Sequence, residues 1–417
     1  MASDLNKMSS TNTTTVPAKA SDKKPRLKFI DMARSIAILM MLEGHFTGAA
    51  LDWKYRDTDY LLFKGWHLLH GLTSPLFFTV TGLIFVYLLI GSRQDVSFWK
   101  NVRVRKGGRR VLQLLFWGYF IQLNLWVIAK SIYYGTEFHM DWFYAFHVLQ
   151  SIAVGLLFVI SIYGVYRLLK FGKLHWYYFI AGVIMLIFYS WMKHYIRLDE
   201  QLLHDGLATE PSYWPQGAPK FIQNMFYGQF STFSFVRMSF YTIFGGMIGA
   251  IIRQYEHKVR EWWFGVVVIV VGLALSIFAR DLFSSIDDFT EYIGLTAKGV
   301  FELNSTSMSR LGQVIVLLGL LILIDRSFKI KAPLFLKVGQ TTFPVYVVHV
   351  IILYGGVFGI GLKPDVFNRD LSPYAAVAIS ATAIAFFVLM VKYIEPLTAI
   401  YNRVVYALRL KKRPEQD

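Results

Sequence analysis

Long apolar segments alternate with short polar segments along most of the chain. Apolar segments of about 18–25 residues recur along most of the chain, and this is about the length that a helix needs to cross the hydrocarbon core of a bilayer. The pattern therefore predicts an all-α, polytopic membrane protein with about ten transmembrane helices. The predicted spans are 29–50, 66–90, 111–130, 143–166, 176–192, 236–252, 262–280, 311–325, 341–362 and 373–395.

Composition supports this class of protein. Hydrophobic residues make up 55% of the chain and charged residues only 17%, whereas a soluble domain of this length carries more charge. The chain has no cysteine, which excludes disulfides, thiolate metal sites and a cysteine nucleophile. We expect no metal ion in its chemistry.

The net charge of +16 raises the question of nucleic-acid binding. Its distribution favours a membrane role, because the predicted inner segments hold more than twice as many Lys and Arg residues as the outer connections. Basic residues concentrate on the cytoplasmic side of membrane proteins, so both termini are predicted to be cytoplasmic. We expect no nucleic-acid partner.

Three regions are predicted along the chain. Residues 1–28 are polar and lack the apolar stretch of a signal peptide, so we interpret them as a disordered cytoplasmic tail. Residues 29–396 form the predicted membrane domain, and 397–417 a basic cytoplasmic tail. The segment 91–110, between the second and third spans, is interpreted as an inner basic loop.

The first predicted span carries ionisable residues, which are costly in a bilayer and are therefore candidates for function. Asp31 and Arg34 are three residues apart and can pair on one helix face. Arg34 and His45 are eleven apart, which is within about 20° of three whole turns and about 16 Å along the axis. This spacing suits an anionic carrier such as coenzyme A, held by Arg34 while its reactive end reaches His45. An interfacial Asp31–Arg34 anchor with a structurally bonded histidine explains the spacing equally well.

Other polar residues lie at the predicted outer ends of four further spans. Each alone is typical of a membrane interface, but as a set they predict a polar cavity that opens outward. These residues are His67, His70, His147, Gln150, Arg237 and Arg310.

Two features lie nearer the predicted inner side. His349, in the ninth span, either lines a channel for the carrier or bonds to a neighbouring helix. In the basic segment before the third span, Arg105, Arg109 and Arg110 are candidate phosphate ligands. The plainer interpretation of that segment is a loop that sets membrane orientation.

Several motifs follow one another in the order of a known superfamily. Residues 29–34 with His45 resemble the opening Arg-x10-His motif of the transmembrane acyltransferases, which include the acyltransferase-3 and heparan-α-glucosaminide N-acetyltransferase-like families. The resemblance favours the second family over the first. Further similar segments are 74–82, 109–119, 148–153 and 339–349.

The resemblance implies a membrane-embedded acyltransferase with an acyl-CoA co-substrate, acetyl-CoA by default, that enters from the cytoplasm. It implies a histidine that acts as base or acyl carrier near the outer side: His45 by one family, His67 or His70 by the other. The acceptor is expected to be an amine or hydroxyl of a sugar, glycan or lipid on the extracytoplasmic side. It also implies that the protein lies in a bacterial inner membrane. Whether the protein forms a homodimer is left open.

Two other functions are compatible with the same residues. A transporter or flippase for an anionic or lipid-linked substrate also needs a polar cavity and basic inner segments. A structural or regulatory membrane protein with the fold but without the chemistry is the third alternative. Only the acyltransferase releases free coenzyme A thiol from an acyl donor.

Overall fold

The computed structural model describes residues 27–92, 95–137, 141–204, 213–231, 233–295, 299–328 and 330–411. Helices make up 79% of it, and the described residues form no β-strand, which confirms the predicted all-α class. The predicted N-terminal tail lies outside these residues up to position 26, and so do the last six residues of the chain.

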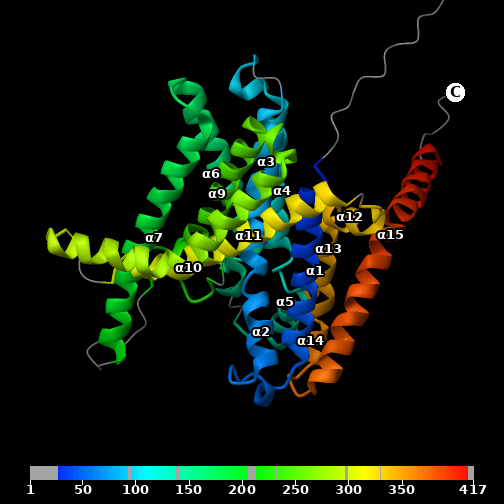
Figure 1. Cartoon of the computed structure of the whole chain (residues 1–417). Coiled ribbons are helices and arrows are strands. Elements are labelled where there is room, and N and C mark those ends of the chain that lie inside the picture. Colours follow the sequence, from blue (N-terminus) through cyan, green and yellow to red (C-terminus); the bar gives the residue numbers. More distant parts are fainter. Residues whose placement is uncertain are drawn as a thin grey trace, which may run out of the picture.

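The helices follow one another along the chain and are connected by short turns (Figure 1). Five of the connecting turns are 3₁₀ helices: η1 (Trp53–Tyr55), η2 (Phe98–Lys100), η3 (Asp141–Tyr144), η4 (Lys258–Arg260) and η5 (Glu302–Asn304). The α-helices are α1 (Lys28–Ala50), α2 (Leu61–His70), α3 (Thr73–Ile90), α4 (Val102–Phe120), α5 (Leu125–Tyr134), α6 (Val148–Leu169), α7 (Leu174–His204), α8 (Lys220–Phe226), α9 (Phe235–Gln254), α10 (Trp262–Tyr292), α11 (Ser305–Ser327), α12 (Pro333–Gln340), α13 (Thr342–Tyr354), α14 (Leu362–Asp365) and α15 (Pro373–Lys411).

Within the described residues, seven segments are long and apolar enough to cross a membrane. The number rises to nine if each of two bent helix pairs, α4 with α5 and α12 with α13, forms one span. A multi-pass membrane protein is therefore supported. The predicted count of ten also requires α1, whose charged residues set it apart from the seven, and that count stays a prediction.

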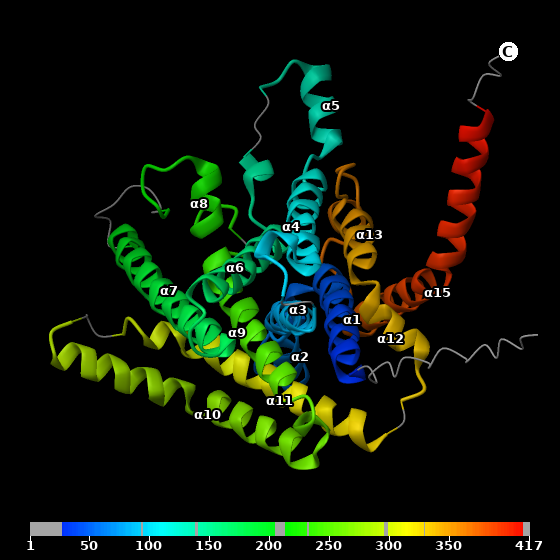
Figure 2. The ribbon, with the colours of Figure 1, turned by 90° about the horizontal axis from the view of Figure 1, so that it is seen from above.

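Helix α1 lies inside the bundle, in contact with α3, α11, α12, α13 and α15 (Figure 2). Its buried residues face several directions, as expected for a helix that is surrounded by others. In Figure 1, α1 starts and α15 ends toward the same end of the molecule. Which side of a membrane this end faces stays a prediction.

Glycine residues allow the backbones of α3 and α9 to touch. A Cβ atom on Gly82 would lie 1.9 Å from the carbonyl oxygen of Thr242, and one on Gly245 would lie 2.0 Å from that of Thr79. Small residues at such positions are the usual means by which membrane helices approach closely. This contact holds α3, which carries much of the site described below, against the rest of the bundle.

The basic segment before the third span is not the loop that we predicted. From Val102 it is the first part of α4, so helix begins nine residues before the predicted span at 111. The side chain of Asn101 caps this helix by accepting hydrogen bonds from the backbone N–H groups of Arg103 and Val104. Gly107 is kept inside the helix because it packs against Phe85, where a Cβ atom would lie 2.6 Å from the ring.

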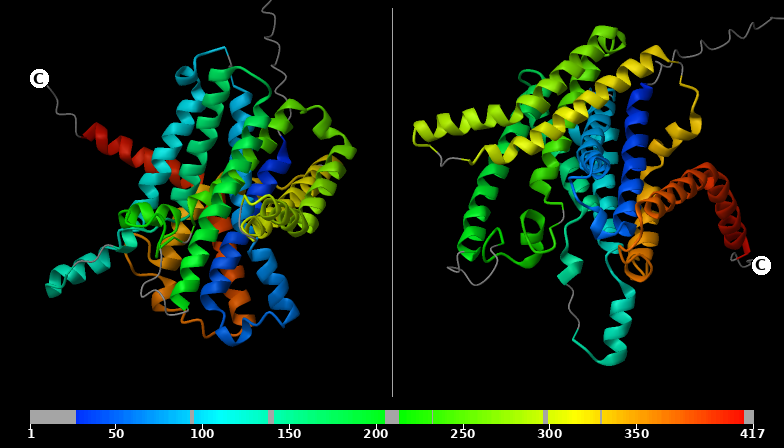
Figure 3. Two further views of the ribbon diagram at one scale, coloured as in Figure 1. Left: turned by 90° about the vertical axis from the view of Figure 1, so that its left-hand side faces the viewer. Right: turned by 60° about the horizontal axis from the view of Figure 1, so that its bottom comes forward.

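Several other boundaries differ from the prediction. Helices α7 and α10 extend to His204 and Tyr292, well beyond the predicted spans. Figure 3 shows α5 projecting from the bundle and α15 changing direction along its length. The change in α15 is accounted for by Pro396, because a proline inside a helix removes one backbone hydrogen bond.

Candidate functional site

Two neighbouring cavities lie along α1, one after the other. The larger cavity, of about 240 Å³, lies beside Arg34, and the histidine cavity, of about 100 Å³, lies beside His45. Phe77 of α3 and Tyr346 of α13 line both of them. The two cavities are therefore neighbours with a shared wall, along the axis that connects Arg34 with His45.

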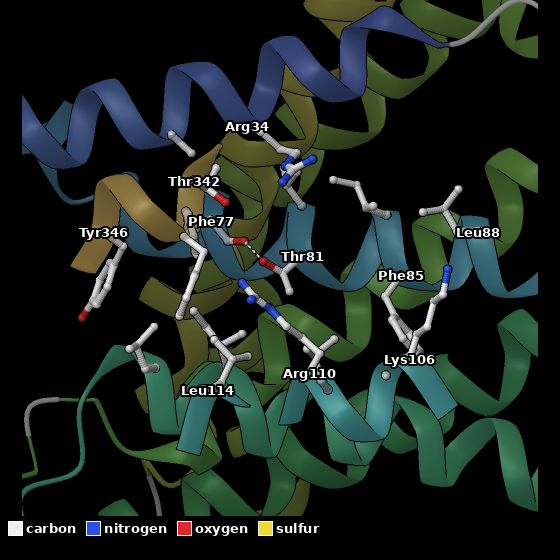
Figure 4. A pocket seen from close by; sticks show the side chains of 18 of the residues that line it. Arg34, Phe77, Thr81, Phe85, Leu88, Lys106, Arg110, Leu114, Thr342 and Tyr346 are labelled. Atoms are coloured by element: carbon white, nitrogen blue, oxygen red, sulfur yellow. Dashed lines mark hydrogen bonds between the residues drawn. The ribbon is translucent and has the colours of Figure 1, made fainter. Parts of the chain in front are cut away.

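The larger cavity has mostly apolar walls and carries basic side chains from its middle to one end (Figure 4). Figure 4 shows Arg34 entering it from α1 and Arg110 from α4, with Lys106 at the end near Leu88 and Tyr346 at the other end. Arg103 also lines the cavity. Positions 103, 106 and 110 of a helix share one face, which explains why these residues of α4 reach the cavity together.

Arg110 and Arg34 are both held in place by specific contacts. The guanidinium group of Arg110 lies 4.4 Å from the ring centroid of Phe343, a cation–π contact that keeps the side chain extended along the cavity. Arg34 lies 3.9 Å from the carboxylate of Asp31, whose residue is only 4% exposed. The predicted Asp31–Arg34 pair is thus present, and it lies next to the cavity.

A small network connects this end of α1 to α12. The hydroxyl group of Ser35 donates to the carbonyl of Phe335 at 2.6 Å and accepts from the backbone N–H of Gly339 at 2.9 Å. The side-chain amide of Gln340 donates to Asp31 at 3.4 Å. A Cβ atom on Gly339 would lie 2.4 Å from the carbonyl oxygen of Asp31, so only glycine allows this approach. The network positions α12 and the start of α13 against the larger cavity.

His45 and His349 form the centre of the second site. Nδ1 of His45 lies 3.1 Å from Nε2 of His349, which is a hydrogen bond between the two rings. His349 is fully buried, whereas His45 lines the histidine cavity. Nδ1 of His349 makes no hydrogen bond among the described residues.

His70 completes the histidine cavity and is positioned by its neighbours. Its ring lies 6.5 Å from that of His45 and stacks on the indole of Trp66 at 5.1 Å with an interplanar angle of 1°. The carboxylate of Glu43 accepts hydrogen bonds of 2.8 Å from Trp66 Nε1 and from the hydroxyl group of Thr47. Glu43 therefore acts on the histidine cavity through Trp66, and not through a bond to His45.

Close packing between α1 and α2 explains why His70 lies so near α1. A Cβ atom on Gly44 would lie 1.9 Å from Nδ1 of His70, so the ring rests directly on the backbone of α1. Arg310 of α11 fixes the other side of α2 by donating to the carbonyl of Leu68 at 2.8 Å. It also lies against Gly71, where the helix breaks before α3. Arg310 is thus a support of α2.

The other predicted site residues do not line either cavity. His67 is exposed and stacks on Phe63 at 6.0 Å. Gln150 is buried but faces Gln122, to which its amide donates at 2.9 Å. Of the two alternatives given for His349, the structure shows the bond to a neighbouring helix, which it makes with His45 of α1. His147, Arg105, Arg109 and Arg237 also lie away from both cavities, and the three arginines are exposed.

Sequence reasoning missed several residues of the site. Arg103 and Lys106 line the larger cavity in place of Arg105 and Arg109, because the segment is helical and only one face of the helix is turned toward the cavity. This period was available as a signal in the sequence. The shared wall of Phe77 and Tyr346, and the connection of Glu43 to Trp66, depend on tertiary contacts that no local pattern shows.

The comparison with protein families gives a match over nearly the whole chain. The model of the acyltransferase-3 family, an acyltransferase domain, matches residues 27–392. No curated protein matches the sequence. The sequence resemblance favoured the heparan-α-glucosaminide N-acetyltransferase-like family over the acyltransferase-3 family. The match is to the acyltransferase-3 family, and the heparan-α-glucosaminide N-acetyltransferase-like branch is not confirmed.

Proposed function

Because the chain belongs to the acyltransferase-3 family, we propose that it transfers an acyl group, acetyl by default, from acyl-CoA to an acceptor on the other side of the membrane. The acceptor group is an amine or hydroxyl of a sugar, glycan or lipid. One observation carries the proposal: a basic cavity and a histidine cavity share Phe77 and Tyr346 along one face of α1. An acyl donor with phosphates at one end and a thioester at the other fits this arrangement.

The basic end of the larger cavity is suited to the phosphates of coenzyme A. Arg34, Lys106 and Arg110 come from two helices and enter one space, so several cations face a bound anion together. Arginine binds phosphate through a planar fork of donors, and lysine as a point charge. The apolar walls then suit the long, thin arm of the donor, which reaches past Phe77 and Tyr346. We place this end on the cytoplasmic side, where acyl-CoA is made.

The His45–His349 pair is suited to accept a proton on His45. We assign the proton of His349 to Nδ1, which leaves its Nε2 as the acceptor of the bond between the two rings. In this tautomer His45 donates from Nδ1 to His349 and presents the lone pair of Nε2. His349 then orients His45 and stabilises the positive charge that develops on it, the role that a buried partner has in other histidine-based sites.

The chemistry follows from these positions. Nε2 of His45 accepts the proton of the acceptor hydroxyl or amine as its oxygen or nitrogen attacks the thioester carbonyl. The carbon–sulfur bond breaks, and the coenzyme A sulfur leaves and receives the proton from His45. Direct attack of Nε2 on the thioester, through a transient acyl-histidine, uses the same geometry. Both routes release free coenzyme A thiol.

Thiol release from acetyl-CoA tests the proposal on the purified protein. The chain has no cysteine, so a thiol reagent detects only the product. We expect slow release without acceptor by the wild type, and loss of release in His45→Ala with binding of acetyl-CoA retained. His67→Ala is the matched control, because His67 is exposed and outside the cavity. Absence of both release and acetyl-CoA binding in the wild type contradicts the proposal and favours a transporter or flippase.

A further inference from the structure

A cluster of three basic residues lies beyond the His45 end of α1, outside both cavities. Arg56 follows η1, Lys363 lies on α14, and Arg369 precedes α15. Two backbone hydrogen bonds bring these distant segments together: Asp52 N–H donates to the carbonyl of Leu371 at 3.0 Å, and Leu371 N–H donates to the carbonyl of Ala50 at 3.1 Å. Figure 1 shows α14 beside the end of α1 and near α2.

Trp53 lies between two of these cations. The guanidinium groups of Arg56 and Arg369 lie 4.5 Å and 4.6 Å from its ring centroid. Arg56 also donates to the carbonyls of Gly48 and Leu51, at 2.8 Å and 2.6 Å, and so is fixed to the end of α1. The indole is nevertheless 61% exposed. Both arginines are therefore held against one ring that is partly exposed to solvent.

Lys363 connects the cluster with the histidine pair. Its ammonium group lies 5.0 Å from the ring centroid of Tyr354, and the edge of Tyr354 meets His45 with ring centroids 5.8 Å apart. Lys363 is also near enough to His45 for its charge to act on that ring. A ligand held by Lys363 thus lies one aromatic ring away from His45.

Among the described residues, no ion pair joins a carboxylate to Arg56, Lys363 or Arg369. The charge of Asp52 acts on Arg56, but Asp52 is itself paired with Lys54 at 3.0 Å. Burial and the charges of Arg369 and Arg56 lower the pKa of Lys363. Burial and the charge of Arg369 likewise lower the pKa of Arg56. Three cations that repel one another in this way gain stability when an anion binds between them.

A role in membrane orientation does not explain these residues. If the larger cavity faces the cytoplasm, the cluster lies on the opposite side, where membrane proteins generally have fewer Lys and Arg residues. It lies instead on the side from which the proposed acceptor approaches His45. Residues that are unfavourable for topology and close to the reacting atom are candidates for substrate binding.

We propose that Arg56, Lys363 and Arg369 bind an anionic group of the acceptor, a phosphate or a carboxylate, and so hold its hydroxyl or amine near His45. This inference rests on the proposed acyltransferase function and names the class of its acceptor. Arginine and lysine together suit either anion, because the guanidinium groups bind two oxygens side by side and the ammonium group adapts to a third. Neutral sugars lack the group that this cluster recognises.

The first experiment measures anion binding without turnover. The protein is saturated with coenzyme A, so that the larger cavity is occupied, and its thermal stability is followed with phosphate or glucuronate against chloride at equal ionic strength. We expect stabilisation of the wild type, and at least a threefold weaker apparent affinity in Lys363→Gln and in Arg369→Gln. Lys64→Gln is the matched control, because Lys64 is exposed and lies on α2, outside the cluster. No stabilisation of the wild type, or equal affinity in all variants, overturns the inference.

The second experiment measures selectivity during turnover. Acetyl-CoA is supplied with glucose, glucose 6-phosphate or glucuronic acid in detergent, or with phosphatidylcholine nanodiscs that contain either phosphatidylglycerol or a neutral glycosyl diacylglycerol. We expect an anionic probe to stimulate thiol release at a concentration at least tenfold lower than its neutral partner does, and Lys363→Gln to reduce this preference. Stimulation by phosphatidylglycerol alone identifies a lipid source of the anion, and stimulation by the charged sugars a soluble one. Equal stimulation by charged and neutral probes overturns the inference.

The two experiments separate this inference from the proposed function. If the protein binds anions in a way that depends on Lys363 but never releases thiol, the cluster is an anion site and the proposed acyltransferase function is wrong. If thiol release depends on His45 but no anion binds, the acyltransferase function holds and the inference of an anionic acceptor is wrong.

Discussion

The two ends of α1 carry different kinds of site. At the Arg34 end, cations from two helices face a larger cavity with apolar walls, and Arg34 and Arg110 are held there by separate contacts with Asp31 and Phe343. At the His45 end, the side chains of α1, α2 and α13 are fixed to one another by ring stacking and hydrogen bonds. The difference indicates that the first end binds a flexible anion by charge and shape, whereas the second holds reacting atoms in one geometry.

The comparison predicts that one substitution at each end affects a different kinetic quantity. Substitutions at the histidine end should lower the rate with little change in donor binding. Substitutions at the basic end should weaken donor binding and change the rate at saturation much less. The following variants test this separation, from the largest expected effect to the smallest.

Removal of the imidazole of His45 should have the largest effect. His45→Ala removes the proposed base, so we expect thiol release to fall by roughly 10²–10⁴-fold. Equilibrium binding of acetyl-CoA should stay within about threefold of the wild type. A loss of binding as large as the loss of rate contradicts the separation of the two ends.

Removal of a cation from the larger cavity should affect donor binding. Arg110→Ala removes charge-assisted hydrogen bonds worth about 1.5–3 kcal/mol, so we expect donor affinity to fall by roughly 10–150-fold. The controls are Arg105→Ala and Arg109→Ala, since both side chains are exposed and lie outside the cavity. Equal losses in the three variants, measured by titration with acetyl-CoA, indicate a general charge effect and not a specific site.

A larger side chain at the shared wall should impede the donor arm. Phe77→Trp fills part of both cavities, so we expect thiol release to fall by about tenfold while binding of coenzyme A, which is held at the basic end, changes little. Phe171→Trp is a control, because Phe171 is exposed and lies outside both cavities. Unchanged release in Phe77→Trp contradicts the passage of the donor between Phe77 and Tyr346.

The support of His70 should make the smallest contribution. Glu43→Ala leaves Trp66 Nε1 without its hydrogen-bond acceptor and frees the ring on which His70 stacks. We expect thiol release to fall by about three- to tenfold, in proportion to a lost hydrogen bond of about 1 kcal/mol. Glu43→Gln keeps a side-chain oxygen that accepts from Trp66, so it should recover most of the activity. Equal loss in both variants would show that the negative charge of Glu43 matters, and not its hydrogen bond with Trp66.

The two ends also differ in how far the sequence predicts them. The Arg34–His45 spacing depends only on helical geometry, and α1 is one continuous helix over both residues, so this part of the site was accessible from the sequence. We predicted Arg105, whereas Arg103 lines the cavity. The error arose because α4 begins at Val102, inside a segment interpreted as a loop. Its cap at Asn101 was a local signal of the helix start.

The histidine end depends on contacts between distant segments. His67 and His70 are equivalent by spacing, and only the packing of α2 on Gly44 turns His70 toward His45 and leaves His67 exposed. The bond from His45 to His349 joins residues 304 positions apart, and α13 reaches it because the chain bends by 74° after α12. No periodicity within one helix predicts such a pairing, although the number of intramembrane histidines indicated that the region is functional.

A cycle that truncates both the donor and the protein tests the central claim most directly. Thiol release is compared for acetyl-CoA and for acetylpantetheine, which keeps the thioester arm and lacks the nucleotide phosphates, in the wild type, Arg110→Ala and His45→Ala. If the phosphates bind at the basic end, Arg110→Ala weakens the use of acetyl-CoA and leaves that of acetylpantetheine unchanged, while His45→Ala abolishes both. Equal loss with both donors in Arg110→Ala, or turnover of acetylpantetheine by His45→Ala, contradicts the assignment of the two ends.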